Sequence, residues 1–279
     1  MWRELLTKNE EMADIAVFGI AYDKNCSVSK GARFAPQRIR KNSEFLPPFT
    51  VNGDEIKTKV FDYGDIKQYD YTKVKDCLQR ALGKKFVLML GGDHSVSILS
   101  QKAYRECQQG KIGLIHIDAH ADICDVYGGS KYSHACVNRR ALENGYTTAD
   151  ITMIGIRSFE KQEAEFFAKN SMEVYTTERT LFLGADKVLC ELKEKYKTYD
   201  NVYLSFDIDA VDPSFAPGTG TPEAFGLPSL EVLKLLTGII KELPVTMMDI
   251  VEVSPPLDTN DITVWLALKY ILEIFNLIH

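Results

Sequence analysis

The sequence lacks the features that mark membrane-spanning, secreted and nucleic-acid-binding proteins. Its 279 residues contain no apolar run near the roughly 20 residues that a membrane-spanning helix needs. The N-terminal stretch carries acids, whereas a signal peptide would begin with basic residues and continue into a long apolar segment. No block of Lys or Arg stands out against the net charge of −6, so we expect neither nucleic acid nor an anionic membrane as a partner.

Cysteine and histidine are scarce as well, and their positions exclude some kinds of site. None of the six cysteines forms a C-x-x-C pair, and their spacing fits neither a zinc finger nor a disulfide framework. We therefore expect reduced thiols in a cytoplasmic protein. The five histidines are His94, His116, His120, His134 and His279. Four of the five histidines thus lie between residues 94 and 134, where we look for a site that uses imidazole groups.

Short apolar runs alternate with longer amphipathic stretches along the chain. The runs predict strands over residues 14–20, 59–64, 86–90, 112–118, 151–156, 172–176, 201–207 and 245–253. The amphipathic stretches predict helices, among them 72–85, 95–110, 227–243 and a last one over 261–277. This alternation indicates a single domain, residues 1–279, with a mainly parallel sheet covered by helices. The spacing alone does not decide between an open three-layer sandwich and a closed barrel.

Acidic and imidazole side chains follow four of the predicted strands. The motif "GGDHS" follows "FVLML", "DAHAD" follows "IGLIHI", "DIDAVDP" follows "VYLSF", and "VEVSPP" follows "TMMDI". Because ligands bind at the carboxyl ends of the strands in parallel α/β folds, we expect these groups to meet at one rim of the sheet.

Four carboxylates and two imidazoles in these motifs are candidate metal ligands. They are His94, Asp118, His120, Asp122, Asp207 and Asp209. Within a motif the candidates alternate, so an extended backbone directs their side chains to one face. Carboxylates gathered away from water repel one another unless cations neutralise them, which predicts two divalent metal ions. Mixed oxygen and nitrogen donors without thiolate suit manganese, and also iron, cobalt, nickel or zinc.

Other polar residues near these motifs have simpler interpretations. Five further acids are interpreted as structural residues, turn residues, loop acids or helix caps: Asp62, Asp65, Asp93, Asp125 and Asp212. His116 lies inside an apolar run, where we favour a core histidine with satisfied hydrogen bonds.

The motifs together resemble those of the ureohydrolases, the arginase and agmatinase family. The similar segments are "GGDHS", "DAHAD", "SFDIDAVDPSFAPGTGTPE", "VEVSPPLD", "GIAYDKNCSVSKGARFAPQRIR" (19–40) and "YSHACVNRRALENG" (132–145). They span residues 14–270 and are closest to the agmatinase branch. The resemblance implies an open αβα sandwich with an eight-stranded, mainly parallel sheet. It also implies two manganese ions and a trimer or hexamer of identical chains.

The resemblance further implies how the site residues divide their roles. One ion would be held by His94, Asp118, Asp122 and Asp207, and the other by Asp118, His120, Asp207 and Asp209. Asp122 would orient the attacking water and pass on its proton, Glu252 would pair with the substrate guanidinium, and His134 would exchange protons with the solvent. The family pattern has Gly-Thr after this histidine, whereas Ala135 and Cys136 follow here. We therefore expect the metal site to follow the family pattern, whereas the backbone of this loop and its contacts with the substrate tail can differ from it.

By the same resemblance, the expected reaction is hydrolysis of a guanidino compound to urea and an amine. Arginases present Asn and Ser in the loop after the "DAH-x-D" motif, whereas this chain has Cys124 and Asp125. We therefore expect agmatine, a small cation, as the substrate and putrescine as the amine. The alternatives are guanidinobutyrate, guanidinopropionate and arginine.

Other classes of protein fit the motifs less well. A binuclear metallophosphatase would need further histidines and a late Asn ligand, but only His279 follows His134. Deacetylases share the implied fold and use a single zinc ion. A non-catalytic homologue that binds metal is the remaining alternative. Cys124 and Cys136 flank the histidine loop and are interpreted as small inert side chains, with a regulatory thiol as the alternative.

Overall fold

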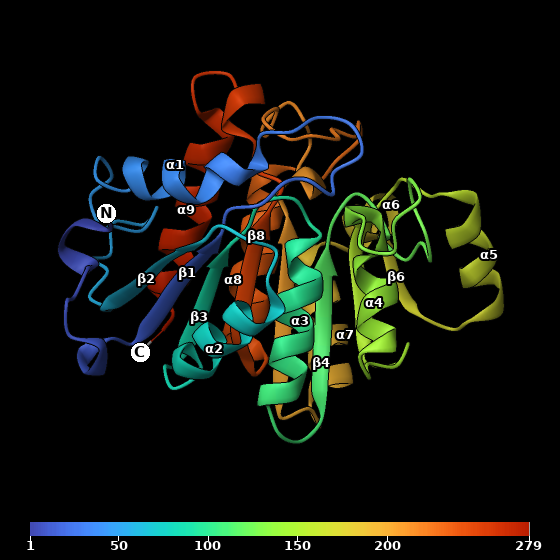
Figure 1. Ribbon diagram of the computed structural model, residues 1–279, viewed down its shortest axis with the longest axis horizontal. Helices are drawn as coiled ribbons and strands as arrows, with labels where there is room; N and C mark the ends of the chain where they lie inside the picture. Colours follow the sequence, from blue (N-terminus) through green and yellow to red (C-terminus); the bar gives the residue numbers. More distant parts are fainter. Residues whose placement is uncertain (279) are drawn as a thin grey trace.

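Eight strands form one parallel sheet in the computed structural model, which describes residues 1–278 (Figure 1). They are β1 (Ile15–Ile20), β2 (Val60–Ile66), β3 (Phe86–Leu90), β4 (Ile112–Ile117), β5 (Ile151–Ile156), β6 (Glu173–Thr176), β7 (Asn201–Asp207) and β8 (Val245–Val251). Their order across the sheet is β2-β1-β3-β8-β7-β4-β5-β6, and each neighbouring pair is parallel. All the predicted strands are present. The sheet is open, with β2 and β6 at its two edges.

Helices connect the strands, as parallel pairing requires. The α-helices in the described residues are α1 (Ala35–Asn42), α2 (Tyr71–Ala81), α3 (Val96–Cys107), α4 (Val137–Glu143), α5 (Lys161–Lys169), α6 (Thr177–Leu183), α7 (Ala185–Tyr196), α8 (Ser229–Glu242) and α9 (Ile262–Phe275). The four helices predicted by name correspond to α2, α3, α8 and α9. None of the helices within residues 1–278 combines the length and the apolar character needed to cross a membrane.

Each face of the sheet has its own hydrophobic core, because successive strand residues point to opposite sides. On one face, Ala16 and Phe18 of β1 pack with residues of α2, α3 and α4. On the other face, Ile15 and Val17 pack with residues of α1, α7, α8 and α9. Figure 1 shows the first group of helices in front of the sheet and α7, α8 and α9 behind it. The predicted three-layer αβα sandwich is confirmed, and the closed barrel is excluded.

The central strands deliver their carboxyl ends to one edge of the sheet. Since β3, β8, β7 and β4 are consecutive neighbours, the loops that follow them lie next to one another. The predicted strand 245–253 ends at Val251, because the next residue, Glu252, has a φ of 60° that leaves the extended region. The motif "VEVSPP" therefore begins with a turn at the rim.

Candidate metal centre

The loops after β3, β4 and β7 bring the six candidate ligands together at the carboxyl edge of the sheet. His94 lies between β3 and α3, and the segment 118–122 follows β4. Asp207 is the last residue of β7, and Asp209 lies in the short 3-10 helix η5 (Ile208–Ala210). Every one of these ligands except His120 is buried. Residues more than one hundred positions apart in the sequence thus share one buried site.

Three carboxylate oxygens surround Nδ1 of His94. The distances are 3.0 Å to Oδ2 of Asp118, 3.1 Å to Oδ2 of Asp122 and 3.2 Å to Oδ2 of Asp207. Although Nδ1 of His94 and Oδ2 of Asp118 are buried, neither has a hydrogen-bond partner of acceptable geometry among the described residues. Buried polar atoms without partners are costly, and a cation between them would remove that cost.

A second group of contacts surrounds His120. Its Nδ1 lies 3.2 Å from Oδ2 of Asp209 and 3.4 Å from Oδ1 of Asp118. Asp118 therefore faces both imidazoles, with one oxygen directed to each. The other oxygen of Asp207, Oδ1, accepts a hydrogen bond of 2.8 Å from the backbone N–H of Asp209. Two adjoining sets of nitrogen and oxygen donors result.

The pKa values of these groups reflect their crowding. Burial by itself lowers the pKa of His94, but its contacts with three carboxylates raise it well above the ordinary value. Burial and the charges of Asp209 and Asp118 raise the pKa of Asp207 well above its usual range. Burial and the charge of Asp118 also raise the pKa of Asp209. The raised pKa values mean that these groups hold protons more tightly, and two divalent cations would neutralise the same negative charge through the same donor atoms. The residues therefore fit a binuclear metal site.

Asp122 is held in an unusual backbone conformation. Its φ is 49°, in the left-handed region that residues other than glycine seldom occupy. Its carbonyl accepts a hydrogen bond of 2.8 Å from the backbone N–H of Asn138, and Nδ2 of Asn138 donates to the carbonyl of Ala121 at 2.9 Å. Helix α4 thus fixes the turn that directs the Asp122 carboxylate to His94. Asn138 was not identified from the sequence, because nothing near it marks it as a partner of a segment sixteen residues earlier.

Glu252 and His134, the other two predicted catalytic residues, form a pair beside the cluster. Nδ1 of His134 lies 3.2 Å from Oε1 of Glu252, and the same oxygen accepts the backbone N–H of His94 at 2.8 Å. Burial lowers the pKa of His134, but the hydrogen bond and the charge of Glu252 outweigh this effect and raise it to about 9. The structure therefore brings all three predicted catalytic residues to the candidate ligands.

A cavity of about 390 Å³ lies over the cluster. Four candidate ligands line it: His120, Asp122, Asp207 and Asp209. The rest of the wall comes from the segments that follow β1, β4, β5 and β7, and it includes Glu160, Glu163 and Glu223. Six carboxylates and no Lys or Arg are among the described lining residues, so the cavity is acidic in character. A cavity of this size and charge favours binding of a small cation.

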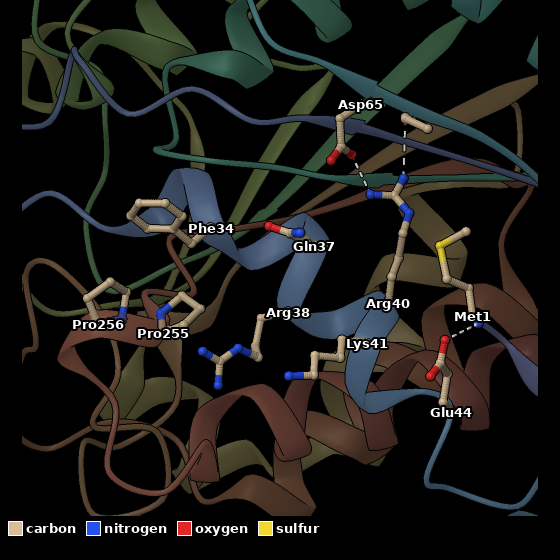
Figure 2. Close-up of a pocket in the computed structure, with 11 residues that line it drawn as sticks. Met1, Phe34, Gln37, Arg38, Arg40, Lys41, Glu44, Asp65, Pro255 and Pro256 are labelled. Atoms are coloured by element: carbon tan, nitrogen blue, oxygen red, sulfur yellow. Dashed lines mark hydrogen bonds and ion pairs between the residues drawn. The ribbon is translucent and has the colours of Figure 1, made fainter.

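A larger cavity, about 730 Å³, lies over α1 and contains none of the candidate ligands (Figure 2). Arg40 on its wall contacts Asp62 at 2.7 and 2.9 Å and also bonds Asp65. Asp62 accepts a further hydrogen bond of 2.7 Å from Nε1 of Trp2. These contacts confirm the structural interpretation of both acids.

Two of the acids interpreted as loop residues behave as expected. Asp125 is exposed and forms an ion pair of 2.8 Å with Arg140. Asp212 accepts hydrogen bonds from the backbone N–H groups of Ser214 at 3.0 Å and Gly226 at 2.9 Å. Both acids therefore order loops, and neither lines the acidic cavity in the part of the chain described.

Asp93 and His116 agree with their interpretations only in part. Asp93 is fully buried rather than solvated, but it accepts the backbone N–H of Ser95 at 3.0 Å at the start of α3, close to the expected role of a helix cap. It also accepts the backbone N–H of Asn25 at 2.9 Å, which ties two loops together. His116 is a core residue, but its hydrogen bonds are not satisfied as we expected. Its Nε2 lies 3.1 Å from both the carbonyl of His120 and Oδ2 of Asp118, whereas its buried Nδ1 has no partner among residues 1–278.

Two buried residues behind His94 were not identified from the sequence. Oγ of Ser205 lies 3.0 Å from Nε2 of His94 and donates to Asp249 at 2.9 Å. Asp249 also accepts hydrogen bonds from the hydroxyls of Tyr203 at 2.6 Å and Ser97 at 2.7 Å. The available signal was a lone acid inside the apolar strand "VTMMDIV". These residues orient the ring that faces the three carboxylates.

Comparisons with known proteins agree with this geometry. The sequence profile described as the Arginase family matches residues 13–276. The chain is 33% identical to a guanidinobutyrase of Pseudomonas aeruginosa over 273 residues, which covers 93% of this chain and 85% of the relative. It is 34% identical to an agmatinase of Neisseria gonorrhoeae over 286 residues, which covers 96% of this chain and 88% of the relative. A solved structure of proclavaminate amidino hydrolase from Streptomyces clavuligerus matches with a TM-score of 0.85 and 32% identity, over 96% of this chain and 93% of that one. The chain therefore belongs to the arginase family of ureohydrolases, hydrolases that act on guanidino C–N bonds.

Proposed function

We propose that the chain hydrolyses agmatine to urea and putrescine with two divalent metal ions. The observation that carries the choice of substrate is the charge of the cavity wall. Beyond the candidate ligands the wall includes Glu160, Glu163 and Glu223, and its described lining has no Lys or Arg. Agmatine is positively charged at both ends, so this wall attracts it along its whole length. The carboxylate of a guanidino acid would instead meet these glutamates, with no Lys or Arg among the described lining residues to pair with it.

The two groups of short contacts support a division of the ligands between two ions. We assign His94, Asp118, Asp122 and Asp207 to one ion, and Asp118, His120, Asp207 and Asp209 to the other. The mixed nitrogen and oxygen donors favour manganese over magnesium or calcium, which prefer oxygen ligands. When bound, such ions lower the pKa of a water molecule and make it a nucleophile near neutral pH.

Three residues of the chain would handle the substrate and its protons. The Asp122 carboxylate orients the attacking water, accepts its proton and passes it toward the leaving nitrogen. His134 exchanges protons between the solvent and the leaving amine. Because the backbone N–H of His94 and the His134 ring occupy Oε1 of Glu252, Oε2 is the oxygen left for the guanidinium. Oε2 lies next to the cavity-lining Gly220, 3.8 Å from where a Cβ would be on that residue. A side chain there would stand between Glu252 and the substrate.

The far end of the cavity would bind the substrate tail. Both oxygens of Glu163 accept backbone N–H groups, from Ile123 and from Glu160, each at 2.9 Å. Glu160 and Glu223 are less buried, and so remain to attract the terminal ammonium. The half-exposed ring of Phe159, 47% accessible, also lines the cavity and offers an apolar contact for the methylene chain.

We further propose that residues 1–279 act as a single ureohydrolase domain in a cytoplasmic homo-oligomer of three or six chains. The resemblance to agmatinases supports the oligomer. All six cysteines are free thiols in the structure, which supports a reducing compartment.

A urea-release assay on the purified protein tests the substrate. With manganese bound, we expect kcat/KM for agmatine to exceed that for 4-guanidinobutyrate, 3-guanidinopropionate and arginine by at least about tenfold, or about 1.4 kcal/mol. The same assay with nickel, cobalt and zinc would identify the metal that gives the highest activity. Equal rates with agmatine and guanidinobutyrate would contradict the assignment.

Two variants separate catalysis from mere metal binding in that assay. Replacing Asp122 by Asn removes the proton acceptor, so the rate of urea release should fall by at least about a hundredfold. Replacing Asp125 by Asn is the matched control, because that exposed acid pairs with Arg140 outside the cavity. A protein that only binds metal would release no urea in any form, and a metallophosphatase would hydrolyse a phosphate ester instead.

A further inference from the structure

His134 has a neighbour on each ring nitrogen. Nδ1 faces Glu252, whereas Nε2 lies 2.8 Å from Oγ of Ser27 and accepts the backbone N–H of Ser27 at 3.2 Å. His134 is only 9% exposed, but Ser27 is exposed and lines the acidic cavity. The Ser27 hydroxyl therefore lies between a buried imidazole nitrogen and the space that holds substrate and solvent.

The loop that carries Ser27, residues 21–31, is packed closely onto the rim of the metal centre. A Cβ on Gly92 would lie 1.8 Å from the carbonyl oxygen of Tyr22, and one on Gly220 would lie 3.0 Å from the carbonyl oxygen of Ser29. The backbone N–H of His134 donates to the carbonyl of Asn25 at 3.2 Å. Because backbone atoms make these contacts, the position of Ser27 relative to His134 is built into the fold.

The hydrogen bonds also specify how the ring is protonated. A backbone N–H can only donate, so Nε2 of His134 accepts from Ser27 and carries no proton in the neutral ring. The proton of the neutral ring is then on Nδ1, where it donates to the Glu252 carboxylate. A proton that enters or leaves the ring at Nε2 meets the Ser27 hydroxyl first, since this group can both donate and accept.

We propose that Ser27 fixes the protonation of His134 and relays protons between its Nε2 and the cavity. The proposal rests on the proposed function, in which His134 exchanges protons during amine release. In the relay, Oγ accepts the proton of Nε2–H while its own O–H proton moves to the leaving amine, so one N–H bond breaks and another forms. Recharging runs in reverse: Oγ gives its proton to Nε2 and takes one from a solvent water or buffer acid. Serine itself is unchanged.

Steady-state urea release from agmatine by the metal-loaded protein tests the relay. Changing Ser27 to Ala should lower kcat by about 10- to 100-fold, within the range of a lost proton-transfer contact, with KM changed by less than about threefold. Ser27→Thr keeps a hydroxyl and should retain kcat within about threefold of the parent protein. Added imidazole, a small proton carrier, should partly restore kcat of Ser27→Ala. Ser29→Ala, in the same loop but outside the described cavity lining, should match the parent protein.

A second measurement does not depend on activity. Nitrogen-15 NMR of the histidine rings, with His134→Gln to assign the signal, should be recorded well above pH 9, because the His134 pKa is raised to about 9 and the ring is neutral only there. It should show a protonated Nδ1 and an unprotonated Nε2 for neutral His134. In Ser27→Ala this preference should weaken, although the metal content stays the same.

The results distinguish failure of the relay from failure of the proposed function. If the parent protein releases urea but Ser27→Ala keeps its full kcat, or Ser27→Thr is as slow as Ser27→Ala, the relay is wrong and the function stands. A neutral His134 protonated at Nε2 in the parent protein also overturns it. If no guanidino compound is hydrolysed, the function fails, and the NMR result still decides whether Ser27 fixes the ring.

Discussion

Asp249 is a carboxylate that lies behind the candidate metal ligands. It is fully buried, and its oxygens accept hydrogen bonds from three hydroxyls and from the backbone N–H of Phe206 at 3.1 Å. One of those hydroxyls, on Ser205, also contacts Nε2 of His94. The Asp249 carboxylate therefore reaches the His94 ring through the Ser205 hydroxyl. Such an outer contact fixes the orientation of a metal-binding imidazole and makes it a stronger ligand.

Replacing Asp249 by Asn should therefore weaken metal binding. The amide keeps the shape but removes the charge, so the contact through Ser205 polarises His94 less. We expect the affinity for manganese to fall by about 10- to 100-fold, measured by metal titration against a chelator. Ser97→Ala is the control, because it removes one hydrogen bond to Asp249 and leaves its charge. This control should lower stability by about 1 kcal/mol and leave the affinity for manganese nearly unchanged.

The sequence predicted the first layer of this site and not the residues behind it. Asp118, His120 and Asp122 could be predicted because alternation within one motif decides which way each side chain points. Asp249 and Ser27 could not, because their partners come from other elements. Only the order of the strands and the fold of the loop after β1 bring these pairs together.

At the scale of elements, the contact between loop 21–31 and the segment after β3 holds one wall of the cavity. We predict that Gly92→Ala displaces this loop, because the new Cβ would clash with the carbonyl of Tyr22. Overpacking of this kind costs about 1–3 kcal/mol, and urea release should be lost with the position of Ser27.

The matched control is Gly83→Ala, at the end of α2. Its Cβ would lie at an ordinary contact distance, 3.5 Å from the carbonyl oxygen of Arg80. Stability should be unchanged or rise by about 0.5 kcal/mol, because alanine restricts the unfolded chain. Thermal unfolding and urea release measure both variants. Gly92→Ala with parental stability and activity would show that the loop is not fixed by this contact.

Element boundaries were predicted less well than element types. The predicted helix 72–85 ends at Ala81, because the backbone N–H groups of Gly83 and Lys84 bond carbonyls only three residues back and that of Lys85 bonds the carbonyl of Asp14, just before β1. The short helices α4 and α6 were not predicted by name, since seven residues give too little periodicity to recognise. Strands buried on both faces were predicted more easily because they are almost entirely apolar.

For the molecule as a whole, the sequence left one question that the structure answers. Spacing and periodicity fit both a barrel and an open sandwich, because both consist of alternating strands and helices. The strand order puts β2 and β6 at open edges and places β3, β8, β7 and β4 in the middle. Only this order makes the motifs after β3, β4, β7 and β8 neighbours. The resemblance to ureohydrolases implied the open sandwich, but neither it nor the residue pattern gave the order of the strands.

The metal centre should also stabilise the whole molecule, because its ligands come from the ends of three central strands, β3, β7 and β4. Without cations, the buried acids repel one another, as the raised pKa values of Asp207 and Asp209 indicate. Removing metal with a chelator should therefore lower Tm, and manganese should raise it again with the logarithm of its concentration. One site at a hundred times its Kd contributes about 2.7 kcal/mol, which corresponds to a shift of about 5–10 °C for a chain of this size. Magnesium at equal concentration is the control and should shift Tm much less, since imidazole ligands disfavour it. If chelated and manganese-loaded protein melted at the same temperature, these side chains would not bind metal in the folded state.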